Sequence, residues 1–309
     1  MLVSPLNLIS TPAPVLNSLG LDLKFGLSSE DPMVGRHPSE PYEAYLSIYS
    51  PEGLLSERLH LGHIPANRRR MFDITEITRK SINHLDHLTV VHRIPSRLVS
   101  QSSNIEDAIE MDQPPDYSFF RSVVEYSYPS GGNGSVIYET PSGLNIGSSA
   151  QKSSNTLVFT CQTVISNVSD TFVILSNYSM DPDYSTMANF KYTLYTLAGE
   201  QAVVGSVAIA PFSTKILDIA GLVPEGVAEK ERDPLDGLSA FTFVGYSEDA
   251  SIPVFFINAS PSLGAVTVEH THPPQSYLFP FDVGYQRRAK ADARSSWSTK
   301  LAGSSLVKR

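Results

Sequence analysis

The stretch Ser47-Ile48-Tyr49-Ser50, followed by a glycine at position 53, returns as Thr193-Leu194-Tyr195-Thr196, followed by a glycine at position 199. Three further matches keep the same order along the chain. They pair Phe72-Asp73-Ile74 with Leu217-Asp218-Ile219, Leu85-Asp86-His87-Leu88 with Leu235-Asp236-Gly237-Leu238, and Pro129-Ser130 with Pro261-Ser262. Such a repeat predicts an internal duplication, in which each copy must bury its own apolar surface or pack against its twin.

A Gly/Ser-rich seam at residues 147–154 separates the two copies. This composition cannot support a core, so we place the domain boundary there. We predict a first domain over residues 1–146, a second over residues 155–285, and a basic, flexible tail over residues 286–309. The copies differ in length by an acidic loop at residues 100–118, which belongs to the first domain.

The apolar segments predict the fold class. Nearly all of them are short, β-branched or aromatic, and bounded by Gly, Pro, Asn or Asp, and none has the period of a long amphipathic helix. We therefore predict an all-β protein of two tandem antiparallel β-sandwich domains, Ig-like or jelly-roll, with seven strands each and an eighth in the second copy at residues 171–176. Asn133-Gly134 predicts a tight hairpin turn. The aspartates Asp73 and Asp218 are predicted to cap short helical or turn segments.

Composition limits the partners and the compartment. The chain has 309 residues and a net charge of −9, and an acidic body disfavours nucleic-acid binding. Its single cysteine, Cys161, cannot form an internal disulfide, and its apolar surroundings predict a buried thiol. We find no secretory signal and no run of about 18 apolar residues. These features predict a cytoplasmic protein without membrane insertion.

The most specific pattern for metal chemistry is Gly264 followed by His270 and His272. In a strand, the two imidazoles would project from one face about 6.6 Å apart and could share a divalent ion. This spacing resembles the first metal motif of the cupin family, Gly-x5-His-x-His, over about 21 residues. The later glutamate of that motif falls on Tyr277, its glycine falls on Gly284, and the second motif has no counterpart. The resemblance implies a metal-dependent enzyme that uses His270, His272 and one divalent transition metal.

Five of the eight histidines lie between positions 60 and 92. Three-residue spacing, as in His60 and His63, places side chains on opposite faces of a strand, so the sequence disfavours joint metal binding by such a pair. Converging loops could still bring His63, His87 and His92 together as a zinc site. No catalytic serine elbow, phosphate loop or dinucleotide fingerprint is present in the sequence.

These observations favour a non-catalytic binding or assembly protein, without a cofactor, that acts with a protein partner or as a homo-oligomer. Duplicated sandwiches offer repeated edge strands and broad faces for such contacts. A cupin-type enzyme is the first alternative. The second is a carbohydrate-binding protein that uses exposed tyrosine and phenylalanine.

Overall fold

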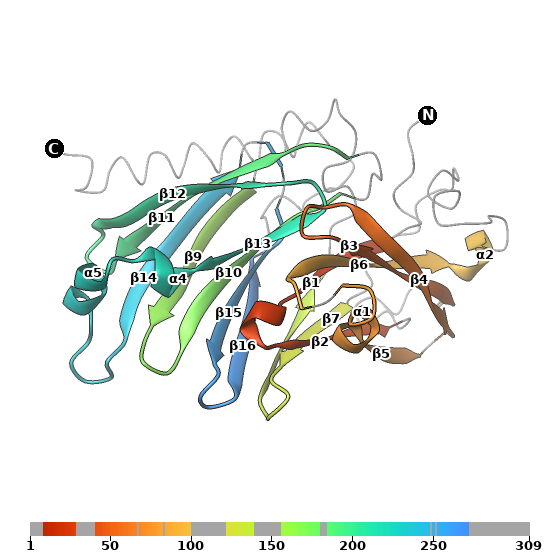
Figure 1. The fold of residues 1–309 in the computed structure, drawn as a ribbon, viewed down its shortest axis with the longest axis horizontal. Helices are drawn as coiled ribbons and strands as arrows, with labels where there is room; N and C mark the ends of the chain where they lie inside the picture. Colours follow the sequence, from red (N-terminus) through yellow and green to blue (C-terminus); the bar gives the residue numbers. More distant parts are fainter. Residues whose placement is uncertain are drawn as a thin grey trace.

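The computed structural model describes residues 9–28, 41–66, 68–82, 84–99, 122–138, 156–179, 184–247, 249–250 and 252–271. The first half of the chain contributes eight strands to two four-stranded antiparallel sheets (Figure 1). These strands are β1 Ile9–Val15, β2 Asp22–Ser28, β3 Tyr42–Tyr49, β4 Leu55–Ile64, β5 Arg69–Asp73, β6 His87–Pro95, β7 Ser122–Ser127 and β8 Asn133–Tyr138. One sheet has the order β1-β6-β3-β4, and the other has the order β5-β2-β7-β8.

The second half repeats this strand order. Its strands are β9 Thr156–Ile165, β10 Asp170–Asn177, β11 Ala188–Thr196, β12 Gln201–Ile209, β13 Ser213–Asp218, β14 Ser239–Ser247, β15 Val254–Ser260 and β16 Ala265–Thr271. They run in the order β12-β11-β14-β9-β10-β15-β16, with β13 also beside β10. A single residue pair, Asp170 with Ile165, joins β9 to β10 and makes this one eight-stranded sheet. An internal duplication would produce the repeated order; the duplication itself stays a prediction.

The fold is all-β, as the sequence predicted, and it is built from antiparallel sandwiches. The first half has eight strands in two four-stranded layers, one strand more than the seven of a simple Ig domain. The count of seven strands in the first half is wrong by one, because β1 was not recognised. β1 contains Pro12 and Pro14, which are unusual inside a strand. They are tolerated because β1 is an edge strand that pairs only with β6 in the described part of the chain.

In the part of the chain that the structure describes, the helical segments are short turns between strands. They are η2 Asn17–Leu19, α1 Ile74–Thr78, α2 Ser96–Val99, α4 Ile219–Leu222 and α5 Glu225–Lys230. Within the described residues, no helix combines the length and apolar character needed to cross a bilayer. The predicted cytoplasmic location stays a prediction.

The two halves share one wall of their cores. In β15, Phe255 and Ile257 belong to the apolar cluster of the first half, whereas Val254 and Phe256 belong to that of the second. Alternate residues of a strand point to opposite faces, so β15 is buried on both sides. The second half therefore packs against the first rather than closing only around its own interior. The predicted seam at residues 147–154 and the acidic loop at residues 100–118 lie outside the described residues.

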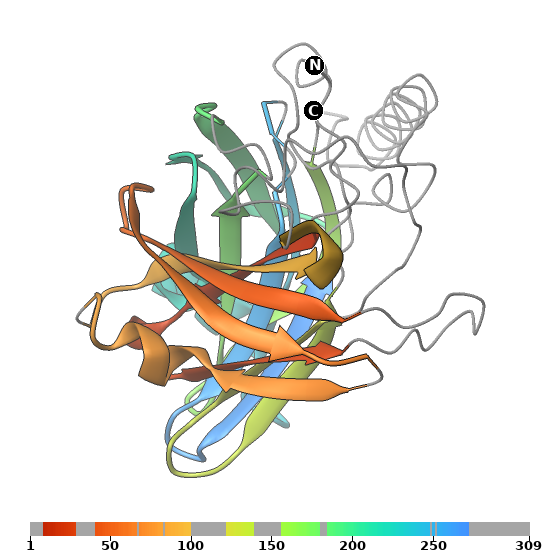
Figure 2. The ribbon, with the colours of Figure 1, turned by 90° about the vertical axis from the view of Figure 1, so that its right-hand side faces the viewer.

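Backbones of the two halves also meet directly where β8 and β16 lie side by side (Figures 1 and 2). The Gly132 N–H donates to the Gly264 carbonyl at 2.7 Å. A Cβ atom at Gly134 would lie 2.8 Å from the Val266 carbonyl oxygen, so only glycine allows this approach. The prediction that Asn133-Gly134 forms the hairpin turn is wrong, because both residues lie in β8 and pair with β7. The turn precedes them, and Tyr128 N–H closes it by donating to the Gly132 carbonyl.

A third apolar cluster covers the outer face of the sheet β1-β6-β3-β4. Tyr49 of β3 stacks on Phe212 of the second half, with ring centroids 4.8 Å apart. Tyr184 meets the same Phe212 ring edge-on at 5.9 Å. Aromatic contacts thus connect two segments that are far apart in sequence.

Candidate functional site at helix α1

Helix α1 is fixed at its start by an aspartate cap. The carboxylate of Asp73 accepts the Glu76 N–H at 2.9 Å, as the sequence predicted. Asp218 holds the same position before α4, but its side chain makes no capping hydrogen bond, so that part of the prediction is wrong. Thr75 anchors α1 to the adjacent strand, because its hydroxyl oxygen accepts the Leu23 N–H at 2.7 Å.

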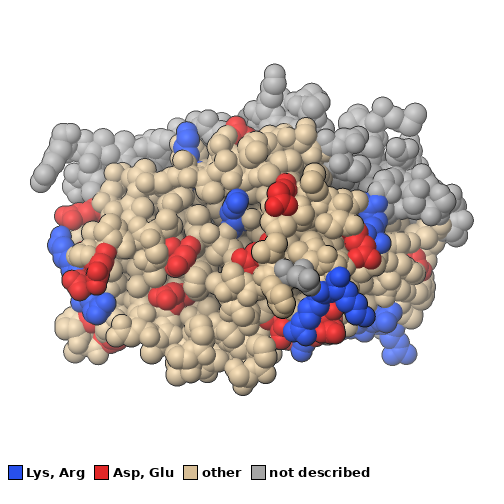
Figure 3. Space-filling view, in the orientation of Figure 1, with Lys and Arg blue, Asp and Glu red and all other residues tan. Residues whose placement is uncertain are grey.

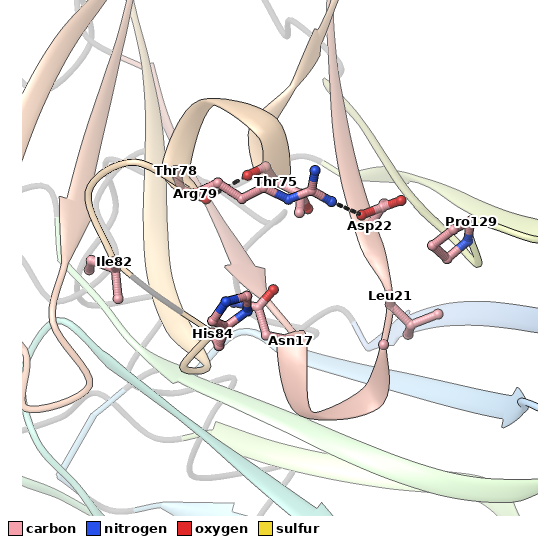
Figure 4. A pocket seen from close by; sticks show the side chains of 10 residues that line it. Asn17, Leu21, Asp22, Thr75, Thr78, Arg79, Ile82, His84 and Pro129 are labelled. Atoms are coloured by element: carbon pink, nitrogen blue, oxygen red, sulfur yellow. Dashed lines mark hydrogen bonds and ion pairs between the residues drawn. The ribbon is translucent and has the colours of Figure 1, made fainter.

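A pocket of about 280 Å³ opens between α1, the η2 turn, the start of β2 and the β7–β8 turn (Figure 4). Polar groups from four separate segments line it, namely Asn17, Asp22, Arg79 and His84. Leu21 and Pro129 contribute apolar wall on one side (Figure 4). Ile82 adds a third apolar side chain to the lining, so the pocket combines apolar and polar walls and is open to solvent.

The Arg79 guanidinium lies between two carboxylates. Its Nη1 donates to Glu76 Oε2 at 2.9 Å, and its Nη2 lies 3.6 Å from Asp22 Oδ1. The second distance is too long for a direct hydrogen bond. In the space-filling view, basic and acidic atoms accordingly lie side by side over the region of α1 (Figure 3). The charge of Arg79 is thus balanced within the protein.

The floor of the pocket is held by the segment that precedes β6. Asn17 Nδ2 donates to the Leu85 carbonyl at 2.9 Å, and Ser18 N–H donates to Asp86 Oδ1 at 2.8 Å. His84 has a φ of +54°, a left-handed conformation that is uncommon for residues other than glycine. The backbone around the pocket is therefore determined by specific contacts.

Two of the predicted histidines meet on a shared carboxylate. His60 Nε2 lies 2.8 Å from Glu43 Oε2, and His63 Nδ1 lies 2.7 Å from Glu43 Oε1. Burial raises the pKa of Glu43, but hydrogen bonds from His63, His60 and Ser96 outweigh it, and the net shift is downward. The expectation that His60 and His63 lie on opposite faces is wrong. A β-bulge opposite Ala44 and Tyr45 inserts one extra residue and returns both imidazoles to one face.

The convergence of His63, His87 and His92, which the sequence left open, does not occur. His87 Nδ1 lies 2.8 Å from the Leu85 carbonyl oxygen, and His92 is buried against Ser47. Within the described residues, no group of three or more His, Cys, Asp or Glu side chains could hold a metal ion. These three histidines therefore do not form a zinc site in the structure.

The Ser47–His92 contact was not foreseen. Ser47 Oγ lies 2.8 Å from His92 Nε2, a distance that suits a serine nucleophile and its base. Ser47 is nevertheless fully buried, and neither residue lines the α1 pocket. A substrate could not reach the hydroxyl in this arrangement, so we interpret the pair as an internal hydrogen bond.

The remaining predicted residues are only partly described. His270 lies in β16 opposite Phe255, but its side chain and all of His272 lie outside the described residues. The two-histidine metal site therefore stays a prediction. Cys161 lies in β9 opposite Phe243, and its side chain is likewise outside the described set.

Neither a protein family nor a curated protein matches the chain. Among solved structures, a glycosyl hydrolase family 2 member from Bacteroides cellulosilyticus aligns with 84% of the chain at 5% identity and a TM-score of 0.21. A putative beta-galactosidase from Bacteroides fragilis aligns with 84% of the chain at 10% identity and a TM-score of 0.18. A beta-glucuronidase from Bacteroides uniformis aligns with 84% of the chain at 8% identity and a TM-score of 0.19. The chain spans 25%, 32% and 25% of these three proteins, respectively. Likeness this weak identifies neither a family nor a function.

Proposed function

We propose that this β-sandwich protein is a non-catalytic binding protein whose α1 pocket receives a neutral polyhydroxyl ligand, such as the terminal residue of a carbohydrate. The observation that carries the proposal is the gap of 3.6 Å between Arg79 Nη2 and Asp22 Oδ1. A hydroxyl group is both a donor and an acceptor. Arg79 and Asp22 do not hydrogen-bond each other directly. One sugar hydroxyl could therefore accept a hydrogen bond from the guanidinium and donate one to the carboxylate.

The charge balance of the pocket favours a neutral ligand over an anion. Two carboxylates, Asp22 and Glu76, already flank the single guanidinium of Arg79. A phosphate or carboxylate entering there would meet like charge from both, which disfavours its binding. The apolar wall of Leu21 and Pro129 suits the less polar face of a sugar ring.

Substitutions at the gap between Arg79 and Asp22 should weaken binding of the sugar. Both Arg79→Ala and Asp22→Asn remove a hydrogen bond to a charged group, worth about 1.5–3 kcal/mol, so we expect affinity to fall roughly tenfold or more. Lys80→Ala is the matched control, because Lys80 is the next residue along the chain but lines a different hollow beside α1. Glycan-array screening followed by isothermal titration with the best ligand measures both effects.

Two outcomes would contradict this function. One is the absence of any glycan bound by the wild-type protein. The other is a ligand whose affinity is lowered equally by Lys80→Ala and Arg79→Ala, since binding would then depend on general charge rather than on the pocket.

A further inference from the structure

Strand β12 forms an outer edge of the eight-stranded sheet. In the described part of the chain it pairs with β11 alone, so one row of its backbone N–H and C=O groups faces away from the sheet. Its sequence, Gln-Ala-Val-Val-Gly-Ser-Val-Ala-Ile, contains neither a charged residue nor a proline. Val204 in its centre is 67% exposed. Long, uncharged edges of this kind are templates for pairing with another strand.

Three of the other outer strands of the described sheets carry features that oppose such pairing. β1 contains Pro12 and Pro14, and β5 contains Arg69 and Arg70. β13 contains Lys215 and Asp218. Prolines and charges on an edge are the usual means by which proteins prevent edge-to-edge association.

The contrast is sharpest with β4, which holds the equivalent place at the end of the first sheet. β4 contains Glu57, Arg58, His60 and His63, and its pairing with β3 is broken by two register shifts. In β12 the only register shift lies at its first residues, opposite Leu194 and Tyr195. Of two edges in the same position, one is protected and one is not.

The sequence of β12 is complementary to itself in antiparallel pairing. If two copies align about Gly205, then Val203 lies opposite Val207 of the other copy, Val204 opposite Ser206, and Ala202 opposite Ala208. No like charges oppose each other across this axis, so no charge repulsion opposes the pairing. Val203 and Val207 already pack on the core of the second half, so their pairing would extend that apolar layer.

We propose that two copies of this chain associate through β12, antiparallel and across a two-fold axis, so that their eight-stranded sheets become one continuous sheet. Such an interface is isologous, and the closed symmetry limits the assembly to a dimer. The proposal does not depend on the ligand of the α1 pocket, because β12 and α1 belong to different halves of the chain.

The test is the oligomeric state of the full chain by sedimentation velocity over a range of concentrations. The wild-type protein should be a dimer. The double variant Val204→Lys/Ser206→Lys places lysines opposite lysines twice in the pair, so its Kd for dimerisation should rise roughly tenfold or more. Leu263→Lys is the matched control, because Leu263 is 70% exposed in the distant β15–β16 turn, and it should leave the dimer intact.

A charge-swap experiment identifies the interface. Val204→Glu/Ser206→Glu should dissociate in the same way, and an equimolar mixture of the lysine and glutamate double variants should form a heterodimer, because opposite charges now face each other. A monomeric wild-type protein would overturn the proposal. So would a dimer that both double variants leave unchanged, or a mixture that stays monomeric after each variant alone has dissociated.

Discussion

Gly53→Ala should lower the free energy of unfolding by about 2–5 kcal/mol. Gly53 lies in the β3–β4 turn with a φ of +87°, where an alanine costs about 1–2 kcal/mol. In addition, its new Cβ atom would lie 1.9 Å from the Pro211 carbonyl oxygen in the second half of the chain. A backbone oxygen cannot rotate away as a side chain can, so the two turns must move apart. Overpacking of this kind costs about 1–3 kcal/mol of stability in addition to the backbone contribution.

Gly237→Ala is the matched control. Gly237 also has a positive φ, +71°, but a Cβ atom there would meet nothing within 4 Å. This variant should lose only the backbone contribution of about 1–2 kcal/mol. Urea unfolding of both variants and of the wild-type protein gives the difference between the two losses, which measures the contact between the halves.

Equal losses in the two variants would show that the turn of Gly53 does not touch Pro211 in solution. The halves would then be more independent than the Tyr49–Phe212 stack and the shared wall of β15 indicate.

Local sequence patterns were sufficient for the fold class and for most strands. Short β-branched runs such as residues 203–209 read directly as strands, because the alternation of exposed and half-buried residues is a property of the strand itself. The aspartate cap of α1 was equally predictable, since Asp73 and its Glu76 partner are three residues apart. β1 was not, because its prolines argue against a strand until its edge position is known.

Features that depend on long-range packing could not be predicted from local sequence patterns. Asn133-Gly134 has the composition of a hairpin turn, yet Gly134 is needed where β8 approaches the backbone of β16. The same applies to His60 and His63, whose shared contact with Glu43 depends on a β-bulge that no spacing rule reveals.

The α1 pocket could not be predicted from the sequence for a related reason. Its polar residues Asn17, Asp22, Arg79 and His84 come from segments that no motif connects, and only the fold brings them together. The one short-range signal was the Phe72-Asp73-Ile74 cap that begins α1, and it identified the helix without indicating a ligand.

Acidification should destabilise the protein through His92. Burial, with a smaller contribution from the positive charge of Arg58, lowers the pKa of this imidazole from 6.5 to about 3. Arg58 Nε donates to Ser47 Oγ at 3.2 Å, so the Ser47 hydroxyl hydrogen can be donated to His92 Nε2. That arrangement requires an unprotonated Nε2, and a proton there would place two donors against each other.

The direction of this pH effect on stability follows from proton linkage. Between pH 6.5 and pH 3 the unfolded chain binds a proton at position 92 that the folded protein does not, so stability falls as the pH falls. The contribution is fully present above pH 6.5. It should decrease by about 2 kcal/mol at pH 5 and by about 4–5 kcal/mol near pH 3, at about 1.4 kcal/mol per pH unit.

His92→Gln removes the titrating group but keeps an acceptor for the Ser47 hydroxyl. Urea unfolding at pH 8 and pH 5 should show that the wild-type protein loses about 2 kcal/mol more than this variant over the interval. Ser47→Ala is the control, because it removes the same hydrogen bond and leaves the imidazole buried, so the acid-dependent loss of stability should persist. If His92→Gln and the wild-type protein lose stability in parallel, the imidazole is not held neutral in the core, and acid sensitivity must come from other groups.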